Sequence, residues 1–178
     1  IEVNMMEIEK WLNDVLEKKN KRAMPIITFP AATKLNISVK KLINDTDQQV
    51  AALKIIKEEC NPLAILGFMD LSVEAECFGA EIKVTDNEVP TVVGQLIEDE
   101  DDAQALKVPA VGSGRSQLYI DAIKKTKAEI KDIPILGGCI GPFSLAGRLM
   151  DVSEAMINCY EEPEMVHIVL EKATKFLI

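Results

Sequence analysis

Aromatic residues and positive charge are both scarce in this sequence. Phenylalanine, tryptophan and tyrosine account for 4% of the 178 residues, so aliphatic side chains and methionine must fill any core. Such a core is typical of parallel β-sheets that are covered by helices. Acidic residues outnumber basic residues by 29 to 20, and the net charge of −9 opposes binding to a phosphate backbone. The composition therefore indicates an α/β domain and excludes nucleic acid as an expected partner.

Metal-binding and membrane-spanning patterns are absent as well. The single histidine, His167, lies in a charged segment, and the four cysteines contain no C-x-x-C pair: Cys60, Cys77, Cys139 and Cys159. Since this pattern offers no obvious three-ligand zinc site, we expect the chain itself to bind no metal. No apolar stretch approaches the roughly 20 residues that span a bilayer, and no secretory signal is present. We expect a soluble, cytoplasmic protein with reduced thiols and no membrane partner.

Apolar runs predict strands that alternate with helices, and 48% hydrophobic residues are enough to bury a core. Three buried strands are expected, at Met24–Phe29, Leu63–Met69 and Pro134–Leu136. Because successive strands joined by helices are parallel neighbours in this class, we expect all three to pair side by side. Asp86 and Asn87 are a turn signal, which predicts a β-hairpin over Glu81–Val93 outside the main sheet.

The remaining segments show helical periodicity and helix start signals. Helices are expected over residues 5–19, Val39–Ile43 after the cap Ser38, residues 45–60, Ser116–Lys131, Ser153–Tyr160 and from Pro163 onward. The acidic run Glu98–Asp102 predicts a solvated loop, because like charges repel one another. The sequence starts without methionine and stops inside the last helix, so we expect a piece that is ordered only with the remaining half of a barrel or with a second copy.

Three carboxylates follow the second predicted strand. Asp70 ends this strand, and Glu74 and Glu76 come next along the chain. The carboxyl ends of the strands form the catalytic face of an α/β barrel, where an acid can hydrogen-bond, polarise or deprotonate a ligand. The alternative is a structural role, in which Asp70 or Ser72 caps a helix and the two glutamates complement its dipole. Both roles stay open at this point.

A glycine-rich segment follows the third predicted strand. Gly137, Gly138 and Gly141 would let the backbone approach a ligand closely, because no Cβ obstructs it. Pro142 suits the first position of a helix whose free N–H groups point at a pocket. Cys139 either faces this pocket or packs in the interior. The segment is therefore a candidate binding loop, and a simple turn is the alternative.

Two segments together resemble the uroporphyrinogen decarboxylase superfamily. Residues 68–81, FMDLSVEAECFGAE, resemble its strand-two motif, including the A-x-x-x-G-A-E stretch of its methyltransferase members. Residues 134–146, PILGGCIGPFSLA, are similar to the third-strand pattern P-x-x-G-x-x-x-G-P-x-[ST]-L-A. The resemblance implies the N-terminal part of a (β/α)8 barrel with an inserted β-hairpin. Residues 1–22 would be an N-terminal helical segment, and residues 23–178 the first three βα units.

The resemblance allows two enzyme branches. True uroporphyrinogen decarboxylases carry arginines in the loop after the first strand, where they pair with the many carboxylates of the substrate. The corresponding loop here, Phe29–Asn36, contains no arginine. The resemblance therefore favours the cobamide-dependent methyltransferases, which move a methyl group between a corrinoid protein and an acceptor such as coenzyme M or tetrahydrofolate. It implies a corrinoid (cobalamin) as methyl carrier, a corrinoid protein as partner, and Asp70 and Glu74 as catalytic residues.

The same resemblance implies that five residues line the cofactor site: Gly137, Gly138, Cys139, Gly141 and Pro142. Thiol-acting members of this branch bind zinc through a His-x-Cys pair and a later cysteine, so zinc ligands would have to come from outside this chain. Two alternatives stay open. One is decarboxylation of uroporphyrinogen in haem biosynthesis, and the other is a non-catalytic module that docks a corrinoid protein. A His-x-Cys pair downstream would favour the enzyme over the module.

Overall fold

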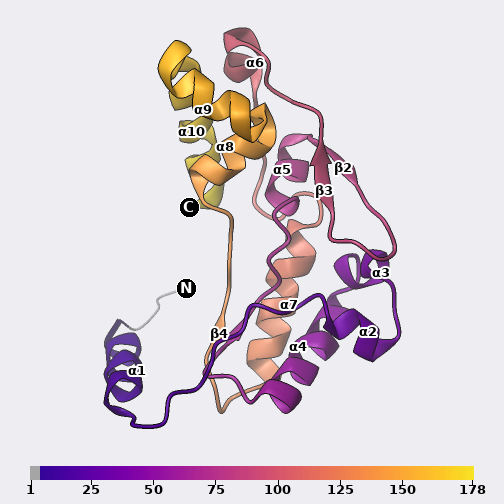
Figure 1. The fold of residues 1–178 in the computed structure, drawn as a ribbon, viewed down its shortest axis with the longest axis vertical. Coiled ribbons are helices and arrows are strands. Elements are labelled where there is room, and N and C mark those ends of the chain that lie inside the picture. The colour runs from indigo at the N-terminus through magenta and orange to yellow at the C-terminus, as the bar shows by residue number, and fades with distance from the viewer. Residues whose placement is uncertain (1–4) are drawn as a thin grey trace.

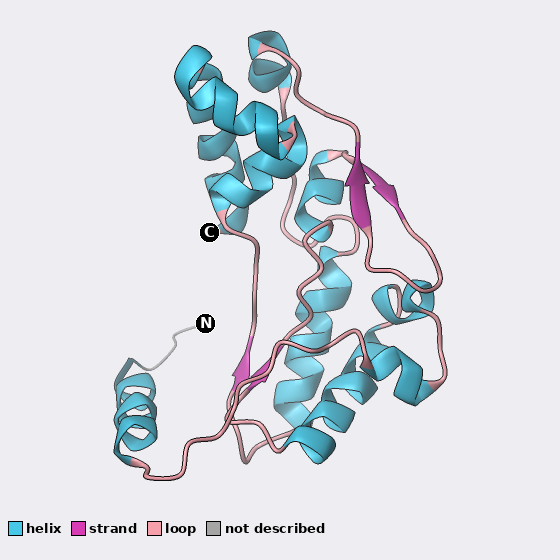
Figure 2. Cartoon of the chain, in the orientation of Figure 1, coloured by secondary structure: helices cyan, strands magenta, loops and turns pink. Residues whose placement is uncertain are grey.

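Helices dominate the computed structural model, which describes residues 5–178 (Figure 1, Figure 2). The order of elements is α1 (Met5–Glu17), α2 (Ala31–Leu35), α3 (Val39–Ile43), α4 (Thr46–Cys60), β1 (Ile65–Leu66), α5 (Val73–Phe78), β2 (Glu81–Lys83), β3 (Thr91–Val93), α6 (Glu100–Ala105), α7 (Ser116–Glu129), β4 (Ile135–Leu136), α8 (Pro142–Met150), α9 (Val152–Glu161) and α10 (Pro163–Leu177). Residues 1–4 of the predicted N-terminal segment lie outside the described residues. Within residues 5–178, no helix has both the length and the apolarity that crossing a membrane requires.

Capping side chains set the starts of two helices near the N-terminus. The hydroxyl of Ser38 accepts a hydrogen bond from the Lys41 N–H at 3.1 Å, which confirms Ser38 as the cap of α3. The carboxylate of Asp45 accepts from the N–H groups of Asp47 and Gln48 and begins α4. These caps satisfy backbone donors that the first helical turn leaves without partners.

The central sheet consists of β1 and β4, which are parallel as predicted. Ile65 lies opposite Ile135, and the amides of Ile65 and Gly67 donate to the carbonyls of Pro134 and Leu136, both at 2.9 Å. Helices α4 and α7, each of which leads into one of these strands, pack against each other beside the pair (Figure 1). The arrangement is a layer of helices on a parallel sheet, as expected for part of an α/β barrel.

The first predicted strand, Met24–Phe29, is not formed. The segment meets the chain leading into β1 through a hydrogen bond from the Leu63 N–H to the Ala23 carbonyl at 2.8 Å, just before the predicted strand begins. Met24, Ile26 and Ile27 are exposed, and only the end of the run is covered, where Thr28 is buried and Phe29 packs against Phe68. A strand of a barrel is held by neighbours on both sides and covered on both faces, and these are lacking here. The prediction of three paired strands is therefore wrong for the first of them.

The predicted hairpin is present outside the central sheet. Strands β2 and β3 are antiparallel, with Glu81 opposite Val93 and Lys83 opposite Thr91. They form a separate two-stranded sheet, away from β1 and β4 in Figure 2. The Asp86–Asn87 signal therefore predicted the reversal of the chain correctly.

The acidic run Glu98–Asp102 is exposed but does not form the expected loop. Asp99 accepts a hydrogen bond from the Asp102 N–H at 2.9 Å and caps α6, whose first turn holds three further acids. Negative charges in the first turn are stabilised by the positive end of the helix dipole, which offsets their mutual repulsion. The loop prediction was wrong because it weighed the repulsion alone.

Buried apolar side chains form two clusters. The first joins α2, α3, α4 and β1, and it includes Leu42, Leu53, Ile65 and Phe68. The second joins α5 to the helices α8, α9 and α10, and it includes Ala75, Leu145, Leu149, Val169 and Ala173. The segment between Phe68 and Ala75 passes from one cluster to the other, and this segment carries Asp70.

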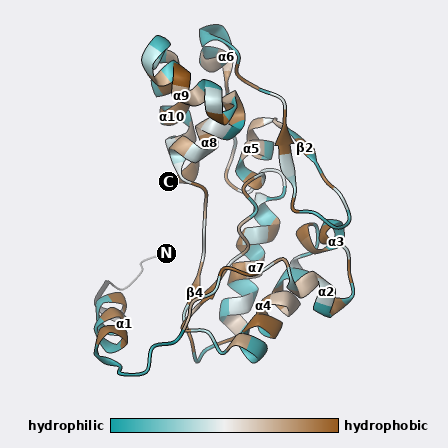
Figure 3. Ribbon diagram, in the orientation of Figure 1, coloured by the Kyte–Doolittle hydropathy of each residue, from teal (hydrophilic) through white to brown (hydrophobic). Residues whose placement is uncertain are grey.

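Helix α1 stands apart from both clusters (Figure 1). Its apolar residues Ile8, Leu12 and Leu16 are exposed, and Figure 3 shows apolar and polar positions alternating along it. This matches the amphipathic helix that the sequence predicts at this position.

We predict that Gly67→Ala destabilises the protein by roughly 1 kcal/mol, because an added Cβ would lie 2.7 Å from Cδ1 of Ile123, the movable end of a side chain. Gly137→Ala is the matched control, since a Cβ there meets no atom within 4 Å. Urea unfolding of both variants measures the difference. Adding Ile123→Val removes the clashing atom, so the double variant should lose less than the sum of the single losses. Equal losses for the two alanine variants would contradict this packing.

Candidate active site

Five residues that the sequence singles out border one cavity of about 350 Å³. They are Asp70, Glu74, Gly137, Gly138 and Cys139. The two acids follow β1, and the other three follow β4. Because β1 and β4 are parallel neighbours, their carboxyl ends bring the two segments together. The remaining wall is mostly apolar and comes from α4, α5, α7, the end of α10 and the segments before α5 and α7. The carboxyl ends of barrel strands are the catalytic face in this class of fold.

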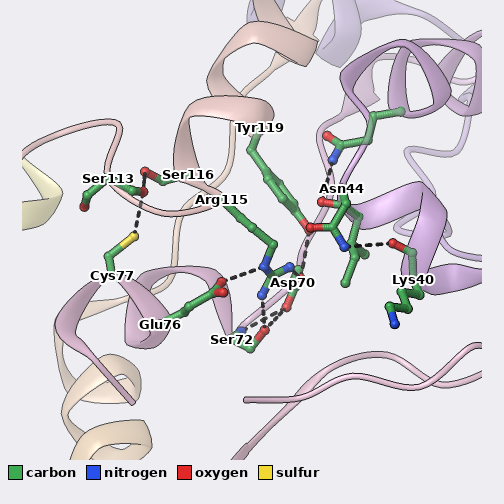
Figure 4. Close-up of polar contacts among 12 residues, drawn as sticks. Lys40, Asn44, Asp70, Ser72, Glu76, Cys77, Ser113, Arg115, Ser116 and Tyr119 are labelled. Atoms are coloured by element: carbon green, nitrogen blue, oxygen red, sulfur yellow. Dashed lines mark hydrogen bonds and ion pairs between the residues drawn. The ribbon is translucent and has the colours of Figure 1, made fainter. Parts of the chain in front are cut away.

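Asp70 is buried, and its carboxylate is fully hydrogen-bonded (Figure 4). Oδ1 accepts from the backbone N–H of Ser72 at 3.0 Å and from its hydroxyl at 2.5 Å. Oδ2 accepts from Nη1 of Arg115 at 2.7 Å and from the hydroxyl of Tyr119 at 2.8 Å. A carboxylate has about four acceptor positions, so these four donors fill them. The structural role considered for Asp70 accounts for its contacts to Ser72 only.

Arg115 and Tyr119 complete this network, and neither was predicted from the sequence as a site residue. Arg115 precedes α7, and Tyr119 lies in the first turns of that helix. Nε of Arg115 also donates to Oε2 of Glu76 at 2.5 Å, so Glu76 binds the arginine and does not border the cavity. A positive charge is disfavoured at a helix N-terminus, and this is the signal that could have pointed to an acidic partner for Arg115.

The network fixes the protonation states of its two titratable donors, Arg115 and Tyr119. Burial disfavours the charge on Arg115, but the hydrogen bond and attraction of Asp70 outweigh burial and raise the pKa of the guanidinium. Burial, followed by the charge of Asp70, raises the pKa of the Tyr119 phenol well above its usual range. Tyr119 therefore stays protonated and donates its hydrogen bond to Asp70.

Glu74 is the cavity carboxyl with acceptor capacity to spare among the described residues. Its Oε1 accepts the backbone N–H of Ile140 at 3.1 Å, which ties α5 to the segment after β4. Burial raises the pKa of Glu74, and the hydrogen bond from Ile140 opposes this rise without cancelling it. A carboxyl with a raised pKa at a cavity wall can take a proton from a ligand or give one to it.

The glycine-rich segment after β4 divides at Ile140. Gly137, Gly138 and Cys139 border the cavity, and all three are exposed. Gly141 and Pro142 do not border it, and Pro142 is instead the first residue of α8, as the sequence predicts. The structure thus brings together three of the five residues that the sequence grouped in this loop.

The residues whose side chains could bind a metal ion are scattered over residues 5–178. No group of three or more histidine, cysteine or acidic side chains in this part of the chain is arranged to hold a metal ion. His167 is exposed on α10, and Cys60 and Cys159 are exposed on other helices. Cys77 contacts the Ser113 carbonyl at 3.1 Å.

Residues 19–178 match the profile of the family described as Uroporphyrinogen decarboxylase (URO-D). A methylcobamide:CoM methyltransferase of Methanosarcina acetivorans is 39% identical over 82 residues, which are 45% of this chain and 24% of that protein. A uroporphyrinogen decarboxylase of Campylobacter concisus is 30% identical over 132 residues, which are 66% of this chain and 38% of that protein. The matched parts therefore span well under half the length of these relatives.

In structure, the chain is similar to a methyltransferase from Methanosarcina mazei. The TM-score is 0.81 at 21% sequence identity, and the similarity covers 95% of this chain and 52% of the other. At this identity the similarity shows the fold. It confirms the fold class predicted from the sequence, part of an α/β barrel with an inserted hairpin.

We predict that Glu74→Gln stabilises the protein at neutral pH. Because the folded-state pKa of Glu74 is raised, its stabilising contribution is present below the ordinary pKa of about 4.3 and is lost as the pH rises through the folded-state pKa. Glutamine can still accept from Ile140 and carries no charge. In urea unfolding, the free energy of unfolding of Glu74→Gln should be higher than that of the wild type at pH 7 and equal to it near pH 4. The exposed control Glu171→Gln should change this free energy little at either pH. A pH-independent difference would contradict a buried charge at Glu74.

Proposed function

The chain belongs to the uroporphyrinogen decarboxylase family, because residues 19–178 match the profile of that family, and we propose that it is the N-terminal part of a methyltransferase of this family. Residues 1–22 would form the N-terminal helical segment, and residues 23–178 the first three βα units of one (β/α)8 barrel. The relatives are longer than this chain, so a longer form of the protein, or a second copy, would supply the remaining units. The activity proposed is transfer of a methyl group between a corrinoid protein and a small acceptor, a thiol or a tetrahydrofolate.

The observation that carries the proposal is the meeting of Asp70, Glu74 and the segment 137–139 at one cavity. A cavity of about 350 Å³ has room for a small acceptor and is too small for a whole corrinoid, whose ring carries many amide side chains. The ring edge would therefore lie across the mouth, where Gly137 and Gly138 leave backbone uncovered by side chains. A methylated corrinoid bound there supplies the methyl group. The Methanosarcina acetivorans relative, which is 39% identical and is named a methylcobamide:CoM methyltransferase, supports a methylated corrinoid as the methyl donor.

Glu74 and Asp70 would have different tasks in the reaction. When a thiol accepts the methyl group, a sulfur–carbon bond forms, the bond between the methyl group and its corrinoid carrier would break, and the thiol proton must leave. Glu74 has a raised pKa and an oxygen without a partner among the described residues, so it would accept this proton. Asp70 has no acceptor position to spare, so it would act as a fixed negative charge in the wall and orient Tyr119. A zinc ion that activates the thiol would take its ligands from outside this chain.

Decarboxylation of uroporphyrinogen is the second candidate, and the Campylobacter concisus relative favours it. The charges around the cavity count against it. Asp70, Glu74 and Lys124 are the charged residues on the wall, and Lys124 lies 3.8 Å from Asp121. Arg115 is engaged by Asp70 and Glu76 and does not border the cavity. A substrate with many carboxylates would therefore meet no unengaged arginine on the described wall.

We predict that the full-length protein demethylates methylcobalamin in the presence of coenzyme M and forms no coproporphyrinogen from uroporphyrinogen. Cobalamin absorbance measures the first reaction and porphyrin analysis the second. Asp70→Asn should lower methyl transfer at least about 10-fold, as expected for loss of a positioned charge at the reacting site. The control Asp132→Asn alters an exposed pair with Lys57 and should leave the rate unchanged.

Coproporphyrinogen formation at an enzymatic rate would reverse the order of the two enzyme functions. Inactivity in both assays, with binding of a corrinoid protein retained, would favour the non-catalytic docking module.

A further inference from the structure

Arg115 has three partners, and all of them come from one short stretch of the chain. Its guanidinium binds Asp70 through Nη1 at 2.7 Å, Ser72 through Nη2 at 3.0 Å and Glu76 through Nε at 2.5 Å (Figure 4). Arg115 is 8% exposed and Asp70 is 4% exposed, so water contributes little to either charge. The arginine therefore joins the start of α7 to the segment that leads from β1 into α5.

The two carboxylates that Arg115 holds are not equivalent. Asp70 is buried and borders the cavity, whereas the side chain of Glu76 is 33% exposed and lies outside it. Asp70 in turn holds the hydroxyl of Tyr119, whose side chain also borders the cavity. Arg115 itself does not border it. Through its contacts, Arg115 therefore reaches a bound ligand by way of Asp70 and Tyr119, and its charge is in addition a minor influence that lowers the pKa of Glu74.

We propose that Arg115 is a positioning residue that locks the Asp70 carboxylate, and through it the Tyr119 hydroxyl, in the orientation that the cavity presents to its ligand. The inference rests on the proposed function for the identity of the ligand, but not for the geometry. Without the guanidinium, a buried carboxylate loses its counter-charge, which strongly destabilises the arrangement around it. Asp70 would then turn away from its present orientation, and Tyr119 would lose a fixed acceptor.

A purely structural arginine is the competing explanation, and the chain offers variants that separate the two. Glu76→Gln removes the partly exposed ion pair and leaves the contact of Arg115 with Asp70. Arg115→Gln removes both ion pairs. Arg148→Gln changes an arginine of α8 that forms no ion pair among the described residues, and it serves as the control. If Arg115 only joined α7 to α5, its role would depend on the ion pair with Glu76 as well as on the ion pair with Asp70.

The first measurement is methyl transfer by the full-length protein. Arg115→Gln should lower kcat about 10- to 100-fold with KM changed less than about threefold, because a misplaced group costs rate more than binding. Glu76→Gln and Arg148→Gln should stay within about threefold of the wild type. Arg115→Gln combined with Asp70→Asn should be no slower than Asp70→Asn alone, since Arg115 acts through Asp70. Additive losses, or an unchanged kcat in Arg115→Gln, would overturn the proposal.

The second measurement does not need activity. The backbone N–H of Ser72 donates to Asp70, whereas that of Ile140 donates to Glu74. Hydrogen–deuterium exchange at Ser72 should be at least about tenfold faster in Arg115→Gln and unchanged in Glu76→Gln, with Ile140 unchanged in both. Unchanged exchange at Ser72 in Arg115→Gln would overturn the proposal, even if the wild type transfers no methyl group. A wild type that is inactive yet shows the expected exchange would refute the proposed function alone.

Discussion

The buried charge of Asp70 constrains how the surrounding elements can be arranged. An unpaired carboxylate in this position would be costly, and removing one partner of a buried ion pair typically costs about 3–5 kcal/mol. Arg115, Tyr119 and Ser72 together supply four hydrogen bonds, two from side chains of another part of the chain. Satisfying this one carboxylate fixes the end of β1, the start of α5 and the start of α7 relative to one another. These elements border the cavity, so its shape depends on the same contacts.

Two carboxyl groups a few residues apart therefore have contrasting surroundings. Asp70 is held by a guanidinium and has no acceptor position left, whereas Glu74 has one backbone donor and is disfavoured as an anion by burial. A carboxyl whose acceptor positions are filled can serve as a fixed charge, and a buried carboxyl with a raised pKa can carry a proton. The proposed roles of Asp70 as an orienting anion and Glu74 as a proton acceptor follow from this difference.

The features that could be predicted from the sequence are those that local signals determine. Caps such as Ser38, the turn at Asp86–Asn87 and the periodicity of α7 are local, and they led to elements close to those observed. Parallel pairing of the second and third predicted strands also followed, and with it the meeting of Asp70 and Gly137 at one cavity. Helix α6 was missed because two local effects opposed each other and only the repulsion was weighed.

The features that could not be predicted depend on distant contacts. Met24–Phe29 has the composition of a buried strand but needs neighbours that a local pattern does not reveal. Arg115 meets Asp70 from 45 residues away, and no pattern near Asp70 indicates this partner. The family resemblance identified Asp70 and Glu74 as a group. It did not show that Arg115 forms an ion pair with Asp70 or that Glu74 keeps an acceptor oxygen at the cavity.

The proposed meeting of a corrinoid and its acceptor at the cavity beside Asp70 can be tested through three exposed thiols. Cys139 borders the cavity, whereas Cys60 and Cys159 lie on helices and do not. Iodoacetamide alkylation of the full-length protein, followed by peptide mass spectrometry, measures all three in one experiment. Methylcobalamin is expected to slow alkylation of Cys139 and to leave alkylation of Cys60 and Cys159 unchanged. Alkylation of Cys139 at the same rate with and without methylcobalamin, at saturating concentration, would contradict the proposed meeting at this cavity.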